Sequence, residues 1–310
     1  MRPQILEVGG CSSYAHPSRG FGGKSRAASL VWEALGNVAN YVEPFAGSAA
    51  VLLARPHAPR CETINDRDGM VANFWRAVKA APDEVAHHAD WPVNEADLHA
   101  RHRWLIGQRE SLTERLVADP EWFDARVAGW WVWGLSAWIG DGWCPPANPS
   151  RKLPSFGNNG RGVHASRVIG WRDLAARLAT VDVACGEWDR VTSPTVVLRA
   201  AGIAGVYLDP PYAEGAQQYA AGGTGTGLSA AVRAWCEEHG SNPRVRIVLS
   251  GYEGEHDALQ RRGWRIVEWS ATGAGYVAAG GERANQRRER LWLSPHCEGA
   301  RQLSLLGGAS

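Results

Sequence analysis

Ile203-Ala204-Gly205-Val206-Tyr207-Leu208-Asp209-Pro210-Pro211-Tyr212 is a short apolar run that ends in an acid, two prolines and an aromatic residue. The run has the length and composition of a buried strand. Because proline cannot donate to a sheet ladder, the strand must end at Asp209, and Pro210 keeps Asp209 out of helical geometry. The sequence therefore predicts a stiff acidic turn at the carboxyl end of a buried strand, where open α/β sheets bind their ligands.

This turn suits one chemistry in particular, the activation of an exocyclic amine on a nucleobase. The lone pair of such an amine is delocalised into the ring, which makes the nitrogen a poor nucleophile. Two groups that accept hydrogen bonds from its N–H donors would hold the nitrogen closer to tetrahedral and make the lone pair available. Asp209 is one candidate acceptor and the carbonyl group of Pro210 is the other, while Tyr212 offers a flat face for an extruded base. The plainer interpretation is a strand end followed by an ordinary proline turn with a surface tyrosine.

A second motif predicts the first βα unit of a nucleotide-binding sheet. The stretch 41–53, YVEPFAGSAAVLL, has the pattern of a strand, a tight glycine turn and a helix. Asp66 follows Gly47 by 19 positions, at the end of the next apolar stretch. In nucleotide-binding sheets, an acid at about this separation along the sequence accepts hydrogen bonds from the ribose hydroxyls.

Further stretches predict the rest of the sheet. Residues 181–185 form a strand that leads into Glu187 and Trp188, a pair suited to a cofactor adenine, with the acid accepting from its amine and the indole packing on its ring. Residues 245–250, 264–269 and 290–293 are predicted to be later strands. Helices alternate with these strands, over 28–35, 68–80 and 229–239, so we expect an α/β fold with a doubly wound, mostly parallel sheet.

The motifs together resemble the Dam-type family of DNA adenine-N6 methyltransferases, which use S-adenosylmethionine. The resemblance spans about residues 20 to 295 and rests on four short stretches, the first of which is Gly22-Gly23-Lys24 before the first helix. Paired glycines before a helix also suit an anion. The family has a further glycine where Ala49 stands, a change that costs little if Ala49 lies in the helix, and usually an aspartate where Glu187 stands.

The resemblance implies a Rossmann-like methyltransferase with a site-specific DNA substrate, and it assigns roles by position. The catalytic motif is Asp209, Pro210, Pro211 and Tyr212. The cofactor-binding residues are Gly22, Gly23, Lys24, Glu43, Pro44, Phe45, Gly47, Asp66, Glu187, Trp188 and Asp209.

The middle of the chain differs in character, and the family carries target recognition there. Residues 91–116 and 122–139 are predicted to be tryptophan-rich helices, and residues 141–172 a glycine- and proline-rich loop with a net charge of +4. We therefore predict a catalytic domain from 1–85 and 173–298, an inserted target-recognition region from 86–172, and a flexible tail from 299–310. The predicted DNA-binding residues are Arg151, Lys152, Asn158, Asn159 and Arg161.

Composition limits the remaining classes. The chain has 310 residues, 45% of them hydrophobic, 21% charged, and a net charge of +1, so a DNA surface must be a local patch. Six widely spaced cysteines without a Cys-x-x-Cys pair favour reduced thiols over disulfides or a metal site. We expect a cytoplasmic protein without a membrane partner or a metal; the sequence does not indicate the oligomeric state, the recognised DNA sequence or the setting, such as restriction-modification.

Other functions remain open at this stage. Amine methylation of cytosine N4 or of an RNA base shares the chemistry, although cytosine-N4 enzymes commonly have serine where Asp209 stands. A non-catalytic DNA-binding protein on a methyltransferase scaffold would not need Asp209 and Tyr212. A nicotinamide dehydrogenase shares the glycine turn but gives no reason for Asp-Pro-Pro-Tyr.

Replacing Arg151, Lys152 and Arg161 together by alanine tests where DNA binds. We expect weaker DNA binding, and each lost phosphate contact should reduce the slope of log affinity against log salt by about 0.9. The affinity for S-adenosylmethionine should not change. An unaltered salt slope would move the DNA path away from this loop.

Overall fold

The computed structural model describes residues 24–138, 143–144, 170–211, 225–269 and 289–299. The apolar stretch that begins at Ile203 forms β4 (Ala204–Leu208), whose five residues are all buried. The strand ends before Asp209, as the prolines predict. The other strands are β1 (Asn40–Glu43), β2 (Cys61–Asp66), β3 (Val181–Cys185), β5 (Val245–Tyr252), β6 (Arg265–Glu268) and β7 (Glu289–Leu293).

In the described residues these strands form one sheet in the order β3-β2-β1-β4-β5-β7-β6. The pairs from β3 through β5 are parallel, and β7 runs antiparallel to both β5 and β6. The strand order reverses between β1 and β4, so the chain has the switch point of a doubly wound sheet. The predicted α/β class and mostly parallel sheet are confirmed, and the fold is Rossmann-like.

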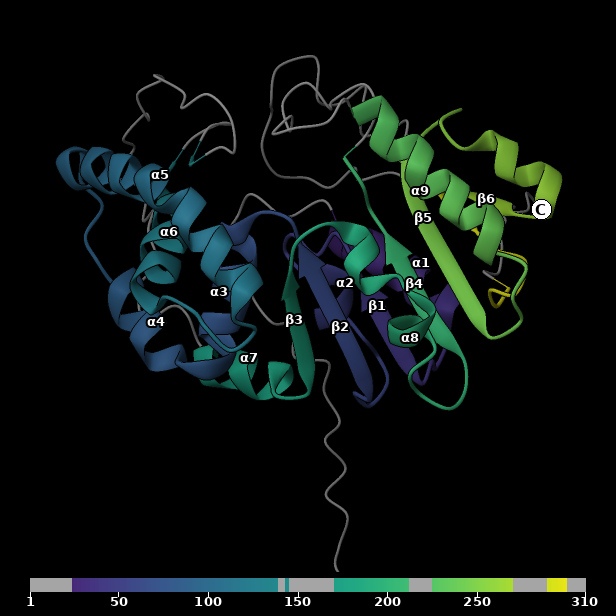
Figure 1. Ribbon diagram of the computed structural model, residues 1–310, viewed down its shortest axis with the longest axis horizontal. Helices are drawn as coiled ribbons and strands as arrows, with labels where there is room; N and C mark the ends of the chain where they lie inside the picture. The colour runs from purple at the N-terminus through teal and green to yellow at the C-terminus, as the bar shows by residue number, and fades with distance from the viewer. Residues whose placement is uncertain (1–23, 139–142, 145–169, 212–224, 270–288, 300–310) are drawn as a thin grey trace, which may run out of the picture.

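Alternating side chains of the strands fill two separate cores, one on each face of the sheet. Tyr41 and Tyr207 pack into the core with the helices α1 and α3, whereas Val42 and Val206 pack into the core with α8 and α9. Figure 1 shows α8 and α9 in front of the sheet.

The helices are α1 (Lys24–Leu35), α2 (Ala50–Leu53), α3 (Gly69–Ala80), α4 (Pro82–Ala89), α5 (Glu95–Ala118), α6 (Ala125–Ala137), α7 (Trp171–Leu178), α8 (Pro194–Val197) and α9 (Gly225–His239), with 3-10 turns η2 (Trp188–Val191) and η4 (Asp257–Arg262).

The tryptophan-rich helices gather beside β3, the edge strand, where α4, α5 and α6 pack against α3 and α7 (Figure 1). Their bounds correct the sequence prediction. The helices begin at their N-caps, because the side chains of Asn94 and Asp124 accept backbone N–H groups of the first turn; Trp91 and Trp122 therefore precede the helices. The helices α4 and α7 were not predicted.

Part of the basic loop was also predicted wrongly. Trp171 and Arg172 belong to α7, and the Arg172 guanidinium is paired with Asp83 at 2.8 Å.

No helix in the described part of the chain is both long enough and apolar enough to cross a membrane.

A buried ion cluster joins β2 to α7 and to the segment that follows α2. The Glu62 carboxylate, fully buried on β2, accepts from Arg55 at 3.0 Å and from Arg177 of α7 at 2.6 Å. Arg55 also donates to the carbonyl of Val38, and Arg177 to the carbonyl of Leu52. Each guanidinium therefore has a charged partner and a backbone acceptor.

Glu62→Gln should leave two buried guanidinium groups without a counter-charge, and we expect the free energy of unfolding to fall by about 3–5 kcal/mol. The matched control is Asp83→Asn, which breaks the exposed pair with Arg172 and should cost far less, because solvent screens that pair. Urea denaturation of both variants measures the difference. Equal losses would contradict a special role for the buried cluster.

Candidate active site

The carboxyl ends of β1, β2, β3 and β4 meet at one edge of the sheet, and the predicted site residues follow them directly. Val42 is aligned with Val206 across the β1–β4 pair, so Phe45 and Asp209 each lie three residues beyond the same register position. On the other side Asp66 is aligned with Cys185, one residue before Gly186. The glycine turn, Asp66, the segment 186–188 and the acidic turn therefore surround the switch point.

Asn65 connects three of these strand ends, and the sequence analysis did not identify it. Its side-chain amide donates to the carbonyl of Pro44 at 3.0 Å and to that of Gly186 at 3.0 Å, while the backbone carbonyl of Asn65 accepts the N–H of Ala46 at 2.9 Å. The side chain is 1% exposed. The sequence signal that could have identified Asn65 is a polar residue at the end of an apolar strand, directly before Asp66. Asn65 sets the spacing of the β1, β2 and β3 loops.

The glycine turn after β1 has two residues in the left-handed region, Gly47 at φ 45° and Ala49 at φ 50°. Ala49 is the N-cap of the short helix α2, not a residue inside it. The condition under which its methyl group would cost little is therefore not met, because an L-residue pays about 1–2 kcal/mol in this conformation. A glycine at this position, as in the family, would avoid that strain.

Asp66 is held in place by the two loops beside it. The N–H of Gly47 donates to one carboxylate oxygen at 2.9 Å, and the N–H of Asp68 donates to the other at 2.8 Å. Burial, and then the charge of Asp68, raise the pKa of Asp66 to about 7. Each oxygen retains further lone-pair capacity, so the group can accept hydroxyl hydrogen bonds in addition.

Two half-buried rings lie beyond the ends of β1 and β3, the strands on either side of β2. Phe45 follows β1 and Trp188 begins η2 after β3, and their centroids are 6.2 Å apart with nearly parallel planes. The neighbouring Glu187 is exposed and pairs with Arg67 at 3.0 Å. The end of β3 thus presents an aromatic surface beside a carboxylate.

Glu43 lies at the end of β1 but faces the interior, with 2% of its surface exposed. It accepts from the Tyr41 hydroxyl at 2.9 Å and from the N–H of Leu52 at 3.2 Å. Burial and the Glu43 charge raise the pKa of Tyr41, which keeps the phenol protonated and able to donate. These contacts fix the glycine turn between β1 and α2, so the direct cofactor contact predicted for Glu43 stays a prediction.

The acidic turn follows β4 as expected. Asp209 is partly exposed, Pro210 is buried and Pro211 is partly exposed. Tyr212, Gly22 and Gly23 lie outside the described residues, as does the side chain of Lys24, which begins α1. All of the predicted DNA-binding residues, Arg151, Lys152, Asn158, Asn159 and Arg161, lie outside them too. Within the described ranges, no three His, Cys, Asp or Glu side chains are grouped as metal ligands.

The sheet order and the loops at the strand ends are consistent with the Rossmann-like methyltransferase fold. Residues 21–104 match the family model of the D12 class N6 adenine-specific DNA methyltransferases, which confirms the family recognised in the sequence. This match supports site-specific adenine-N6 methylation of DNA, and nothing found favours the alternative functions. No curated protein matches the chain.

Proposed function

We propose that this chain transfers a methyl group from S-adenosylmethionine to the N6 amine of adenine in DNA. The observation that carries the proposal is the position of Asp209 and Pro210, directly after buried β4 and beside the glycine turn of β1 at the switch point. The family match over residues 21–104 supports the same reaction.

The strand-end residues fit the cofactor chemically. Asp66 has acceptor capacity for the ribose hydroxyls, and the Phe45–Trp188 surface suits the adenine ring. Glu187 can accept from the adenine amine if it exchanges part of its exposed pairing with Arg67. When bound, S-adenosylmethionine supplies a methyl group on a sulfonium, a good electrophile, so the chain mainly aligns the reactants.

The acidic turn would hold the target amine. Asp209 and the carbonyl of Pro210 accept hydrogen bonds from the two N–H groups of this amine. The lone pair of the nitrogen is then directed at the methyl group. The two prolines fix the backbone of this turn before the target arrives, which lowers the cost of alignment. Tyr212 is proposed to stack on the extruded adenine.

DNA is the proposed partner, with the region 86–172 as the target-recognition part. The family match and the basic character of residues 141–172 support this assignment. Asn158, Asn159 and Arg161 have the chemistry to read adenine or guanine edges, and Arg151 and Lys152 the charge to bind phosphates. The cytoplasmic location and the domain bounds stay predictions.

Asp209→Ala should reduce methyl transfer by a factor on the order of 10²–10³, as expected when a fixed electrostatic contact to the reacting group is lost. Transfer of labelled methyl groups from S-adenosylmethionine to DNA measures it, with digestion to nucleosides to identify N6-methyladenine. Cofactor binding should stay within a few fold of wild type. The control is Asp173→Ala, an exposed acid on α7. Substantial turnover by the Asp209 variant would refute the assignment.

Asp66→Asn tests the cofactor contact. Because the pKa of Asp66 is raised to about 7, about half of the carboxyl groups are protonated at pH 7 before binding. Ribose hydroxyls favour the ionised form, so cofactor binding should lower this pKa and release protons. Calorimetry at pH 7 in buffers of different ionisation enthalpy should show more proton release for wild type than for the variant, and about tenfold weaker binding by the variant. Equal proton release and equal affinity would make Asp66 a structural acid.

A further inference from the structure

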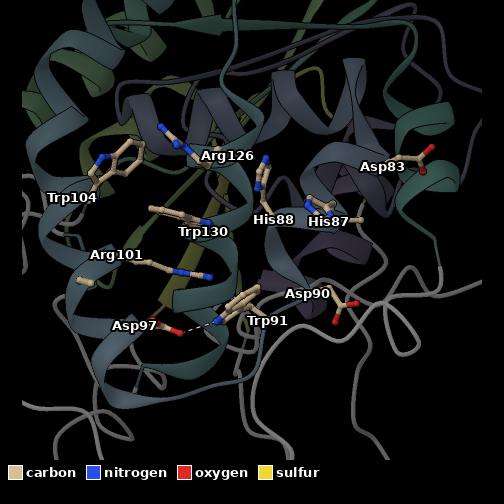
Figure 2. Close-up of a pocket in the computed structure, with 12 residues that line it drawn as sticks. Asp83, His87, His88, Asp90, Trp91, Asp97, Arg101, Trp104, Arg126 and Trp130 are labelled. Carbon is tan, nitrogen blue, oxygen red and sulfur yellow. Dashed lines mark hydrogen bonds between the residues drawn. The ribbon is translucent and has the colours of Figure 1, made fainter.

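A pocket of about 690 Å³ lies between α4, α5 and α6, apart from the strand ends. All of its lining residues fall between Asp83 and Trp130, and none belongs to the loops that follow β1 to β4. Figure 2 shows tryptophan, arginine and acidic side chains around the hollow. The volume is in the usual range for small-ligand sites.

Arg101 of α5 is the unusual group in this pocket. It is 8% exposed, and its guanidinium lies 4.3 Å from the Trp133 ring centroid and 4.8 Å from that of Trp130. Figure 2 shows it between Trp130 and Trp91. Burial lowers the pKa of Arg101. Its Nη1 is buried and has no hydrogen-bond partner among the described residues.

Asp97, four residues earlier on α5, attracts this cation but forms no ion pair with it in the described part of the chain. Asp97 accepts instead from the Trp91 indole N–H at 2.7 Å and from the Asn94 amide at 2.6 Å. The tryptophan rings attract the cation, but a ring face does not replace an acceptor for a buried N–H donor. An anion in the pocket would supply the counter-charge that Arg101 lacks.

The walls supply flat surfaces and a second cation. Trp91 is 47% exposed, yet it is held by its bond to Asp97, and its carbonyl accepts the Trp133 indole N–H at 2.7 Å. At the rim the exposed Arg126 lies 4.6 Å over the Trp104 ring. Arg101 lies 5.3 Å from the Trp91 ring centroid, whereas Arg126 lies on the other side of Trp130 (Figure 2). The pocket therefore offers one exposed ring with a cation beside it and a second, separate cation, which suits a ligand with a planar part and anionic groups.

We propose that this pocket binds a nucleotide unit, with its base on Trp91 and its phosphate near Arg101, while Arg126, on the other side of Trp130, is available to a neighbouring phosphate. The unit has two possible sources with the same chemistry, a free mononucleotide or a nucleotide of a DNA strand. The site is separate from the proposed cofactor and target sites.

Calorimetric titration of the full chain with adenosine monophosphate tests the proposal, with S-adenosylhomocysteine present at saturation to block the strand-end site. We expect binding that weakens about tenfold or more in Trp91→Leu, which removes the stacking face. Arg126→Ala, which removes an exposed guanidinium, should have its larger effect on ligands that carry a neighbouring phosphate. Adenosine, without the phosphate, should bind more weakly than the monophosphate. The matched control is Arg103→Ala, an exposed arginine two positions further along α5.

A parallel titration with a short single-stranded oligonucleotide identifies the source. If the same two variants weaken oligonucleotide binding more than mononucleotide binding, the natural ligand is a DNA strand; the reverse indicates a free nucleotide. The proposal is overturned if neither probe binds, or if binding is insensitive to both variants. Arg101 would then be a purely structural cation among tryptophans. These binding assays are independent of methyl transfer, so their failure is distinct from failure of the Asp209 test.

Discussion

The candidate active site depends on the hydrogen bonds of two adjacent residues, Asn65 and Asp66, at the end of β2. A parallel sheet brings strand ends to one edge, but it does not fix the loops that leave them. Asn65 ties the loops after β1 and β3 to each other, and Asp66 accepts from the glycine turn and from the first residues toward α3. Both N–H donors of the Asn65 amide and one lone pair on each Asp66 oxygen are used, which offsets part of the cost of burying these groups. Asp66 still carries a raised pKa, which is typical of functional carboxylates.

Polar groups also join the sheet to the helical region. Glu62 on β2 binds guanidinium groups that come from both sides of the long excursion through α4, α5 and α6. The return of the chain to the sheet at α7 is thus fixed by a charged cluster in addition to apolar packing. Beside it the tryptophans do more than fill space. They surround cations, as Trp122 does with Arg115 and three rings do with Arg101.

Much of the fold could be predicted because its signals are local. The prolines after Leu208 end β4 whatever surrounds them, and the spacing of Gly47 and Asp66 places both at strand ends. The predicted starts of two helices were wrong, although the contacts that decide them are local. Asn94 and Asp124 are the N-caps, so α5 and α6 begin after the neighbouring tryptophans. The conformation of Ala49 was missed because alanine gives no sign of a left-handed turn.

The sequence by itself determined the class of sheet, the order of the motifs and the acids at the strand ends, since turn chemistry and periodicity are written in neighbouring residues. Only the tertiary structure decided what those acids touch. Glu43 faces the interior and Asp66 is clamped by two loops, although both are acids at strand ends in the sequence. The difference comes from groups distant along the chain, Leu52 in one case and Gly47 in the other. Arg101 likewise reads as one more charge on a polar helix, and only packing against α6 makes it a buried cation.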